Sequence, residues 1–177
     1  MIIKNEFYSE SFKIETPYVH IHYPDILTPL DPVEIDLSGE ENVDAILATV
    51  EQEGLVFRPN MVVTSDPSAY PLVDAAYAAY EAALDQHSGA RLLSTDLVPV
   101  EDEEGTPIGR VFRFVYRRDR FQDVIVKKWV FATGQTHLHF SASFLPSQAA
   151  MIEGAFDWVA DHLRFKASQA ELVASAE

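Results

Sequence analysis

The segment RVFRFVYRRDRFQDVIVKKWVFATGQTHLHFSASFL, residues 110–145, carries the strongest structural pattern of this chain. Three runs are rich in β-branched and aromatic residues, and in the last of them large apolar residues alternate strictly with polar ones. This period of two is typical of a β-strand with two distinct faces. The runs are separated by RRDRFQD (Arg117–Asp123) and TGQ (Thr133–Gln135). Connections this short join antiparallel neighbours. The segment therefore predicts a meander, and the turn sequence EDEEGTP (Glu101–Pro107) extends it back to a strand beginning near Leu92.

Two helical patterns flank the meander. Before it, apolar residues repeat at helical spacing between Ser68, a suitable N-cap, and Gly89, a suitable stop, which predicts a helix over residues 69–87. After it, Pro146 and Ser147 begin a second amphipathic pattern that predicts a helix over residues 147–164. We expect an α+β fold in which an antiparallel sheet of roughly five to seven strands is flanked by helices.

The amino-terminal third is less regular. The patterns predict two short strands within Phe12–Tyr23 separated by Pro17, an irregular stretch over 24–37, a short helix from Ser38 to Gly54, and a strand from Leu55 to Ser65. The short helix rests on one apolar stripe formed by Val43, Ile46, Leu47 and Val50.

Composition limits the chemistry that is available to the chain. Its 177 residues are 47% hydrophobic and include no cysteine, so a real core is expected and thiolate metal sites, disulfides and thiol catalysis are excluded. We expect one domain over residues 1–165, followed by a polar tail over 166–177. No signal peptide or membrane-spanning run occurs in this sequence, which predicts a cytoplasmic protein.

Charge is distributed unevenly along the chain. Residues 1–109 hold 4 basic and 21 acidic side chains, whereas residues 110–177 hold 9 basic and 7 acidic ones, within a net charge of -15. The overall negative charge argues against nucleic acid as a partner, because a phosphate backbone requires a positive footprint. The basic meander on an acidic body instead points to a protein partner.

The candidate partner-binding site follows from this charge. We expect an outward sheet face that mixes cationic, apolar and imidazole side chains, formed by Arg113, Val115, Arg117, Lys128, Val130, His137 and His139. An acidic or amphipathic segment would lie across this face or add as a strand at its edge. One alternative stays open, in which the protein's own acidic loops, Glu101–Glu104 or Glu40–Glu41, neutralise these cations.

Catalytic and metal-binding signals are weak. The pairs His20/His22 and His137/His139 would each project to one face of a strand, and on adjacent strands they could bind zinc. Ser141 and Ser143 near the second pair lack the elbow sequence of a serine nucleophile. We therefore expect no catalytic residue, no metal and no cofactor.

The order of these elements resembles the PsbP-like fold, also called the Mog/PsbP or DcrB/LpqN-like fold. The resemblance rests on FRPNMVVTS (Phe57–Ser65), a following helix of about twenty residues, the tryptophan of KKWVF (Lys127–Phe131) in the middle strand, and the closing DWVADHLRF (Asp157–Phe165). It implies an α/β/α sandwich around an antiparallel sheet.

Known members of this superfamily are mostly non-enzymatic. They include a Ran-binding nuclear-transport factor, a photosystem II subunit, LpqN-like actinobacterial lipoproteins, and cytoplasmic Eag-type chaperones that shield hydrophobic segments of secreted effectors. This sequence has neither a lipobox cysteine nor a transit segment, which favours the cytoplasmic binding proteins.

Three classes of function therefore remain. The first is a cytoplasmic adaptor or chaperone that holds a protein partner, with a secreted effector as one such partner and a homodimer left open. The second is a small-molecule or lipid-binding module with a pocket between sheet and helix. The third is a metal-dependent enzyme that uses the histidine pairs.

Overall fold

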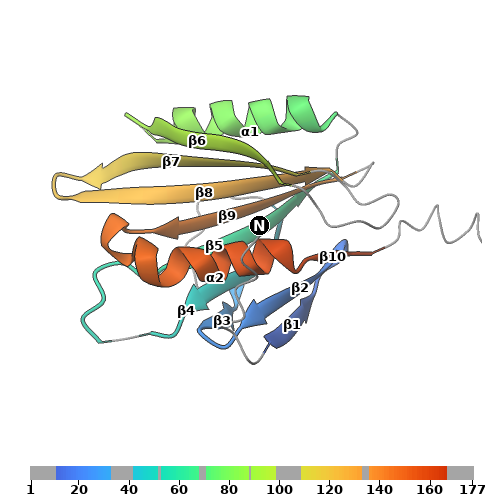
Figure 1. The fold of residues 1–177 in the computed structure, drawn as a ribbon, viewed down its shortest axis with the longest axis horizontal. Helices are drawn as coiled ribbons and strands as arrows, with labels where there is room; N and C mark the ends of the chain where they lie inside the picture. The colour runs from blue at the N-terminus through green and yellow to red at the C-terminus, as the bar shows by residue number, and fades with distance from the viewer. Residues whose placement is uncertain are drawn as a thin grey trace, which may run out of the picture.

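Two antiparallel sheets form the framework of the protein (Figure 1). The computed structural model describes residues 11–32, 42–51, 53–67, 71–87, 89–98, 109–132 and 136–166. The larger sheet has seven strands in the order β3-β4-β5-β9-β8-β7-β6, and every neighbouring pair is antiparallel. Its strands are β3 (Leu27–Leu30), β4 (Val43–Thr49), β5 (Asn60–Asp66), β6 (Arg91–Val98), β7 (Gly109–Asp119), β8 (Gln122–Ala132) and β9 (His137–Phe144).

The smaller sheet joins the amino-terminal strands to the end of the described chain. It contains β1 (Ser11–Glu15), β2 (Val19–Pro24) and β10 (Arg164–Phe165), in the order β1-β2-β10. The side chains of Val19 and Ile21 on β2 are fully buried and belong to the same core as the larger sheet.

One helix covers each face of the meander, as the α/β/α prediction requires. Helix α1 (Leu72–Gln86) packs four alanines, Ala75, Ala76, Ala79 and Ala83, against β7 and β8. Helix α2 (Ala149–Asp161) follows a single 3₁₀ turn, η2 (Pro146–Gln148), and crosses the opposite face in front of β9 and β5 (Figure 1). No helix among the residues described is long and apolar enough to cross a membrane.

The alternation along β8 divides the core in two. Val124, Val126 and Val130 are buried on the side of α1, together with Phe112 and Phe114 of β7. Ile125, Trp129 and Phe131 are buried on the side of α2. The antiparallel pairing of β6 with β7, β7 with β8 and β8 with β9 confirms the predicted meander.

Three local predictions differ from the structure. The short helix predicted between Ser38 and Gly54 is wrong, because Val43–Thr49 forms strand β4. Residues 45–48 are all buried, since this strand lies between β3 and β5 with both faces covered. A strand buried on both faces has a continuous apolar run, which fits helical spacing equally well.

The other two differences concern boundaries. Strand β3 lies in the stretch predicted to be irregular, and β5 begins at Asn60 rather than at Leu55. Several other predictions fall outside the described residues: the caps at Ser38 and Ser68, the turns at 101–107 and 133–135, and the tail beyond residue 166.

The two tryptophans have different roles. Trp129 is buried within the core, whereas Trp158 of α2 is half-buried, packs against the edge of that core and stacks on His162 with ring centroids 3.9 Å apart. Phe156 is the fully buried aromatic residue of α2, and it stacks on Phe144 of β9 at 6.1 Å.

We predict that Phe156→Ala lowers the free energy of unfolding by about 3–5 kcal/mol, because truncating a buried aromatic residue leaves a cavity. Met151→Ala is the matched control, since Met151 lies on the same helix with 68% of its surface exposed. Its substitution should change stability by less than about 0.5 kcal/mol. Urea denaturation of both variants measures the difference. A loss below about 1 kcal/mol for Phe156→Ala would contradict the packing of α2.

Candidate functional site

The seven residues predicted to share one outward face lie on both faces of the sheet. Across the β7–β8 hairpin, Arg113 is opposite Lys127, and Phe112 is opposite Lys128. Arg113, Val115 and Arg117 therefore lie on the side of α2, whereas Lys128 and Val130 lie on the side of α1. The prediction of a single face is wrong. It placed Arg113 and Lys128 on the same face, whereas the hairpin register places Arg113 opposite Lys127.

Helix α2 neutralises two of the sheet cations. The Arg113 guanidinium donates to Glu153 at 3.1 Å, and the Lys127 ammonium pairs with Glu153 at 3.5 Å and with Asp157. Burial raises the pKa of Asp157 despite the nearby lysine. Arg113 is thus held by an acidic residue of the chain itself. This acid lies on α2. The acidic loops that the sequence alternative named, Glu40–Glu41 and Glu101–Glu104, lie outside the described residues.

The other predicted residues are mostly internal. Val130 and His137 are buried, and His139 is partly buried beside them on β9. Desolvation, and then the nearby Lys128 and His137, lower the pKa of His139 from 6.5 to about 3. Its ring is therefore neutral at ordinary pH. A neutral, partly buried imidazole is a poor means of attracting an acidic partner.

The two histidine pairs do not combine. His20 and His22 lie on β2 of the smaller sheet, whereas His137 and His139 lie on β9 between β5 and β8 of the larger one. A shared zinc site would require the two pairs to lie on adjacent strands, and β2 and β9 are not adjacent. Within the described ranges, no group of three or more histidine, aspartate or glutamate side chains is placed to hold a metal ion.

Strand β6 is the most exposed apolar element of the larger sheet. Every residue from Arg91 to Leu97 is exposed, including Leu92 (42%), Leu93 (48%) and Leu97 (59%). In the described part of the chain, β7 is the only strand that pairs with it. A bulge shifts the register between Leu92 and Ser94, after which Ser94–Val98 pairs regularly with β7.

The remaining sheet edges carry features that disfavour further pairing. At the opposite edge of the larger sheet, β3 has four residues and contains Pro29, which has no N–H to donate. In the smaller sheet, β1 carries the charged pair Lys13–Glu15 at 2.8 Å, and β10 has only two residues. Short strands, prolines and charges are the usual protections of a sheet edge. Strand β6 carries Arg91, Asp96 and one bulge, but it has eight residues, no proline and three exposed leucines.

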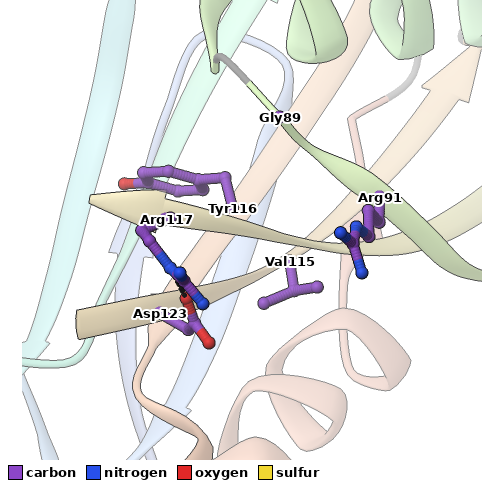
Figure 2. Close-up of a pocket in the computed structure, with 6 residues that line it drawn as sticks. All are labelled: Gly89, Arg91, Val115, Tyr116, Arg117 and Asp123. Atoms are coloured by element: carbon purple, nitrogen blue, oxygen red, sulfur yellow. Dashed lines mark hydrogen bonds and ion pairs between the residues drawn. The ribbon is translucent and has the colours of Figure 1, made fainter. Parts of the chain in front are cut away.

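A shallow pocket of about 280 Å³ lies where β6 begins and β7 ends. It is lined by Gly89, Arg91, Val115, Tyr116, Arg117 and Asp123. Figure 2 shows Arg91, Val115 and Arg117 on one side of the two strands and Tyr116 on the other. The guanidinium of Arg117 donates to Asp123 at 2.9 Å and lowers the pKa of that carboxyl.

The pocket contains two of the seven residues predicted from sequence, Val115 and Arg117. Arg91, which is opposite Val115 across β6 and β7, was not predicted. The signal that sequence reasoning missed is the lack of alternation in RLLSTDLV, residues 91–98. A strand exposed on both faces places no constraint on which positions are apolar.

We predict that His139 makes stability depend on pH. The unfolded chain protonates this histidine below about pH 6.5, whereas the folded protein does not until about pH 3. Stability is therefore lost as the pH falls through this window, by about 1.5 kcal/mol between pH 6.5 and pH 5. Urea denaturation of the wild type and of His139→Gln at both pH values tests this. Equal losses in the two proteins would contradict it.

Comparison with known proteins identifies the fold. No family model and no curated protein matches the chain. Among solved structures it is similar to a Pseudomonas aeruginosa protein of unknown function, for which a regulatory role has been suggested, with TM-score 0.60 and 15% identity over 80% of this chain and 99% of that one. It is also similar to the cyanobacterial PsbP of Synechocystis, with TM-score 0.60 and 13% identity over 94% and 98% of the two chains.

The Saccharomyces cerevisiae Ran-binding protein Mog1p is a third similar structure. Its TM-score is 0.57 and its identity 11%, over 88% of this chain and 95% of Mog1p. All three matches cover nearly the whole of the other chain, so the similarity extends to the complete architecture. With its antiparallel sheets and two flanking helices, the chain has the PsbP-like fold.

Proposed function

We propose that this protein is a non-enzymatic, cytoplasmic adaptor or chaperone that holds an extended segment of a protein partner against strand β6. A secreted effector is one partner of this kind. The observation that carries the proposal is the edge strand β6, which pairs only with β7 among the described residues. It is a long strand with exposed leucines on a sheet whose other edge is short and contains Pro29.

An unpaired strand edge is a binding surface in its own right. Its outward N–H and C=O groups can continue the ladder of hydrogen bonds with an added strand, and each such bond contributes about 0.5–1.5 kcal/mol. The side chains of Leu92 and Leu97 supply apolar area for the partner to cover. Backbone pairing provides affinity, and side-chain contacts provide the choice of partner.

The sheet faces of the meander are already used inside the protein. Helix α1 covers Phe112 and Phe114, and helix α2 binds Arg113 and Lys127 through acidic side chains. Of the predicted partner-binding residues, Val115 and Arg117 lie beside the start of β6, and we keep these two in the proposed site. A partner bound to β6 would contact the chain without displacing either helix.

The structural neighbours support binding over catalysis. Mog1p, which shares the fold over 88% of this chain, is a Ran-binding protein. A shared fold does not fix a shared site, so Mog1p supports only the general role, that this architecture can serve protein recognition. The location of the site comes from β6 itself.

We predict that lysines on the edge abolish partner capture. Leu93→Lys with Leu97→Lys places two charges on β6, where charge discourages strand addition. The matched control is Val56→Lys with Met151→Lys, which adds the same charge at exposed apolar positions outside β6 (77% and 68% exposed). Immobilised proteins are used to capture partners from the native host, and mass spectrometry quantifies them.

The wild type and the control should capture the same partner, and the edge variant should lose it by about tenfold or more, as expected when several backbone hydrogen bonds are lost. The unfolding midpoints of all three proteins should agree, since the substituted side chains are exposed in each case. If the folded edge variant captures the partner as well as the wild type does, the proposed site is wrong.

A further inference from the structure

The end of the sheet where β6 begins is cationic. Arg91 and Arg117 both border the pocket, and Asp123 is the single carboxylate among its lining residues. Arg117 is the larger cause of the lowered pKa of Asp123, and Arg91 contributes to it as well. Arg117 pairs directly with Asp123, and Arg91 lies near enough to act on this carboxylate electrostatically. Arg91 forms no salt bridge with any residue that the structure describes, so it can bind a second carboxylate.

Sheet geometry fixes which end of a bound strand reaches this pocket. A strand that adds antiparallel to β6 runs in the same direction as β7, since β6 and β7 are themselves antiparallel. Its carboxyl end then lies beside Arg91, the first residue of β6. A strand that adds in parallel would bring its amino end there instead.

The charge at the far end of β6 has the opposite sign. Asp96 is exposed near the end of the strand, and it lies on the same sheet face as Arg91 because the bulge at residues 92–94 restores their alignment. Arg91 is opposite Val115 and Asp96 is opposite Val111, and both valines pack toward the core beneath α2. On one face, strand β6 therefore carries a positive charge at its start and a negative charge near its end.

From these observations we propose the chemistry and direction of the partner segment, a proposal that rests on partner binding at β6. The segment adds antiparallel to β6 and carries an acidic side chain near its carboxyl end, which binds over Arg91 and the Arg117–Asp123 pair. A basic side chain near its amino end faces Asp96. On the opposite face, apolar side chains of the segment cover Leu92 and Leu97, which are opposite Phe114 and Arg110 on the α1 side.

This arrangement selects one direction of binding. In the antiparallel orientation both charged pairs attract, whereas the same segment added in parallel would bring its acidic side chain to Asp96 and its basic one to Arg91. Like charges directly opposite one another in a sheet are destabilising. Electrostatic complementarity would therefore fix the register and polarity of the partner more than its overall affinity.

Two synthetic peptides of identical composition test the proposal. Each has nine residues in which valine alternates with polar residues, and the two charged residues are at the third and seventh positions, because Arg91 and Asp96 are opposite Val115 and Val111, four residues apart on β7. Both termini are blocked so that only side chains are charged. The first peptide has lysine near its amino end and glutamate near its carboxyl end, and the second exchanges them. Fluorescence anisotropy measures the binding of each to the full chain at low salt.

We expect the first peptide to bind about three- to tenfold more tightly than the second, because the second forms both ion pairs only by adding in parallel, which is the less stable pairing. Arg91→Glu should abolish or invert this preference. Arg164→Glu is the matched control, since Arg164 is an exposed arginine on β10 of the smaller sheet, and it should leave the preference unchanged.

Three outcomes would overturn the proposal. The first is that the wild type binds the two peptides equally well or not at all. The second is that the preference for the first peptide survives Arg91→Glu. The third is a dimer of this chain that Leu97→Lys dissociates, which would assign the edge to a second copy. If the peptides fail while partner capture still depends on Leu93 and Leu97, the direction and charge of the segment are wrong but the proposed function stands. Loss of that dependence would instead reject the proposed function.

Discussion

The burial of β8 on both faces is the constraint on which the rest of the structure depends. Val124, Val126 and Val130 are covered from the side of α1, while Trp129 and Phe131 are covered from the side of α2. This leaves little of the central meander free. Even the charged residues of the α2 face, Arg113 and Lys127, are bound by Glu153 and Asp157. Because the faces of the meander serve the fold, the proposed binding site lies at a sheet edge.

The edges of the two sheets are not equivalent. Strands β3, β1 and β10 are limited by a proline, by a charged pair or by length. Strand β6 also carries two charged residues and one bulge, but it has eight residues, three of them exposed leucines. Natural sheets usually protect such an edge, because it can pair with any extended chain. Among the described residues, β6 has no strand on its outer side and lies beside a cationic pocket, an arrangement that fits a protein that acquires its last strand from a partner.

Sequence reasoning predicted the elements better than their arrangement. The alternation of residues 137–144 and the helices near 72–86 and 149–161 could be predicted from periodicity alone. Strand β4 could not, because Val43, Ile46 and Leu47 fit a helical stripe as well as a strand buried on both faces. The sheet face on which Lys128 lies depends on the register of the β7–β8 hairpin, and the length of the turn between these strands did not predict that register. The edge position of β6 depends on strand order, since β9 inserts between β5 and β8.

Hydrogen–deuterium exchange of the full chain, with and without the peptide that has glutamate near its carboxyl end, tests strand addition most directly. We expect slower exchange of the amides of Arg91–Val98 when the peptide is bound. The amides of the opposite edge strand, Leu27–Leu30, should be unchanged and serve as the internal reference. Protection confined to β3, or to α1 with none in β6, would contradict the claim that this protein binds its partner at the open edge of the sheet.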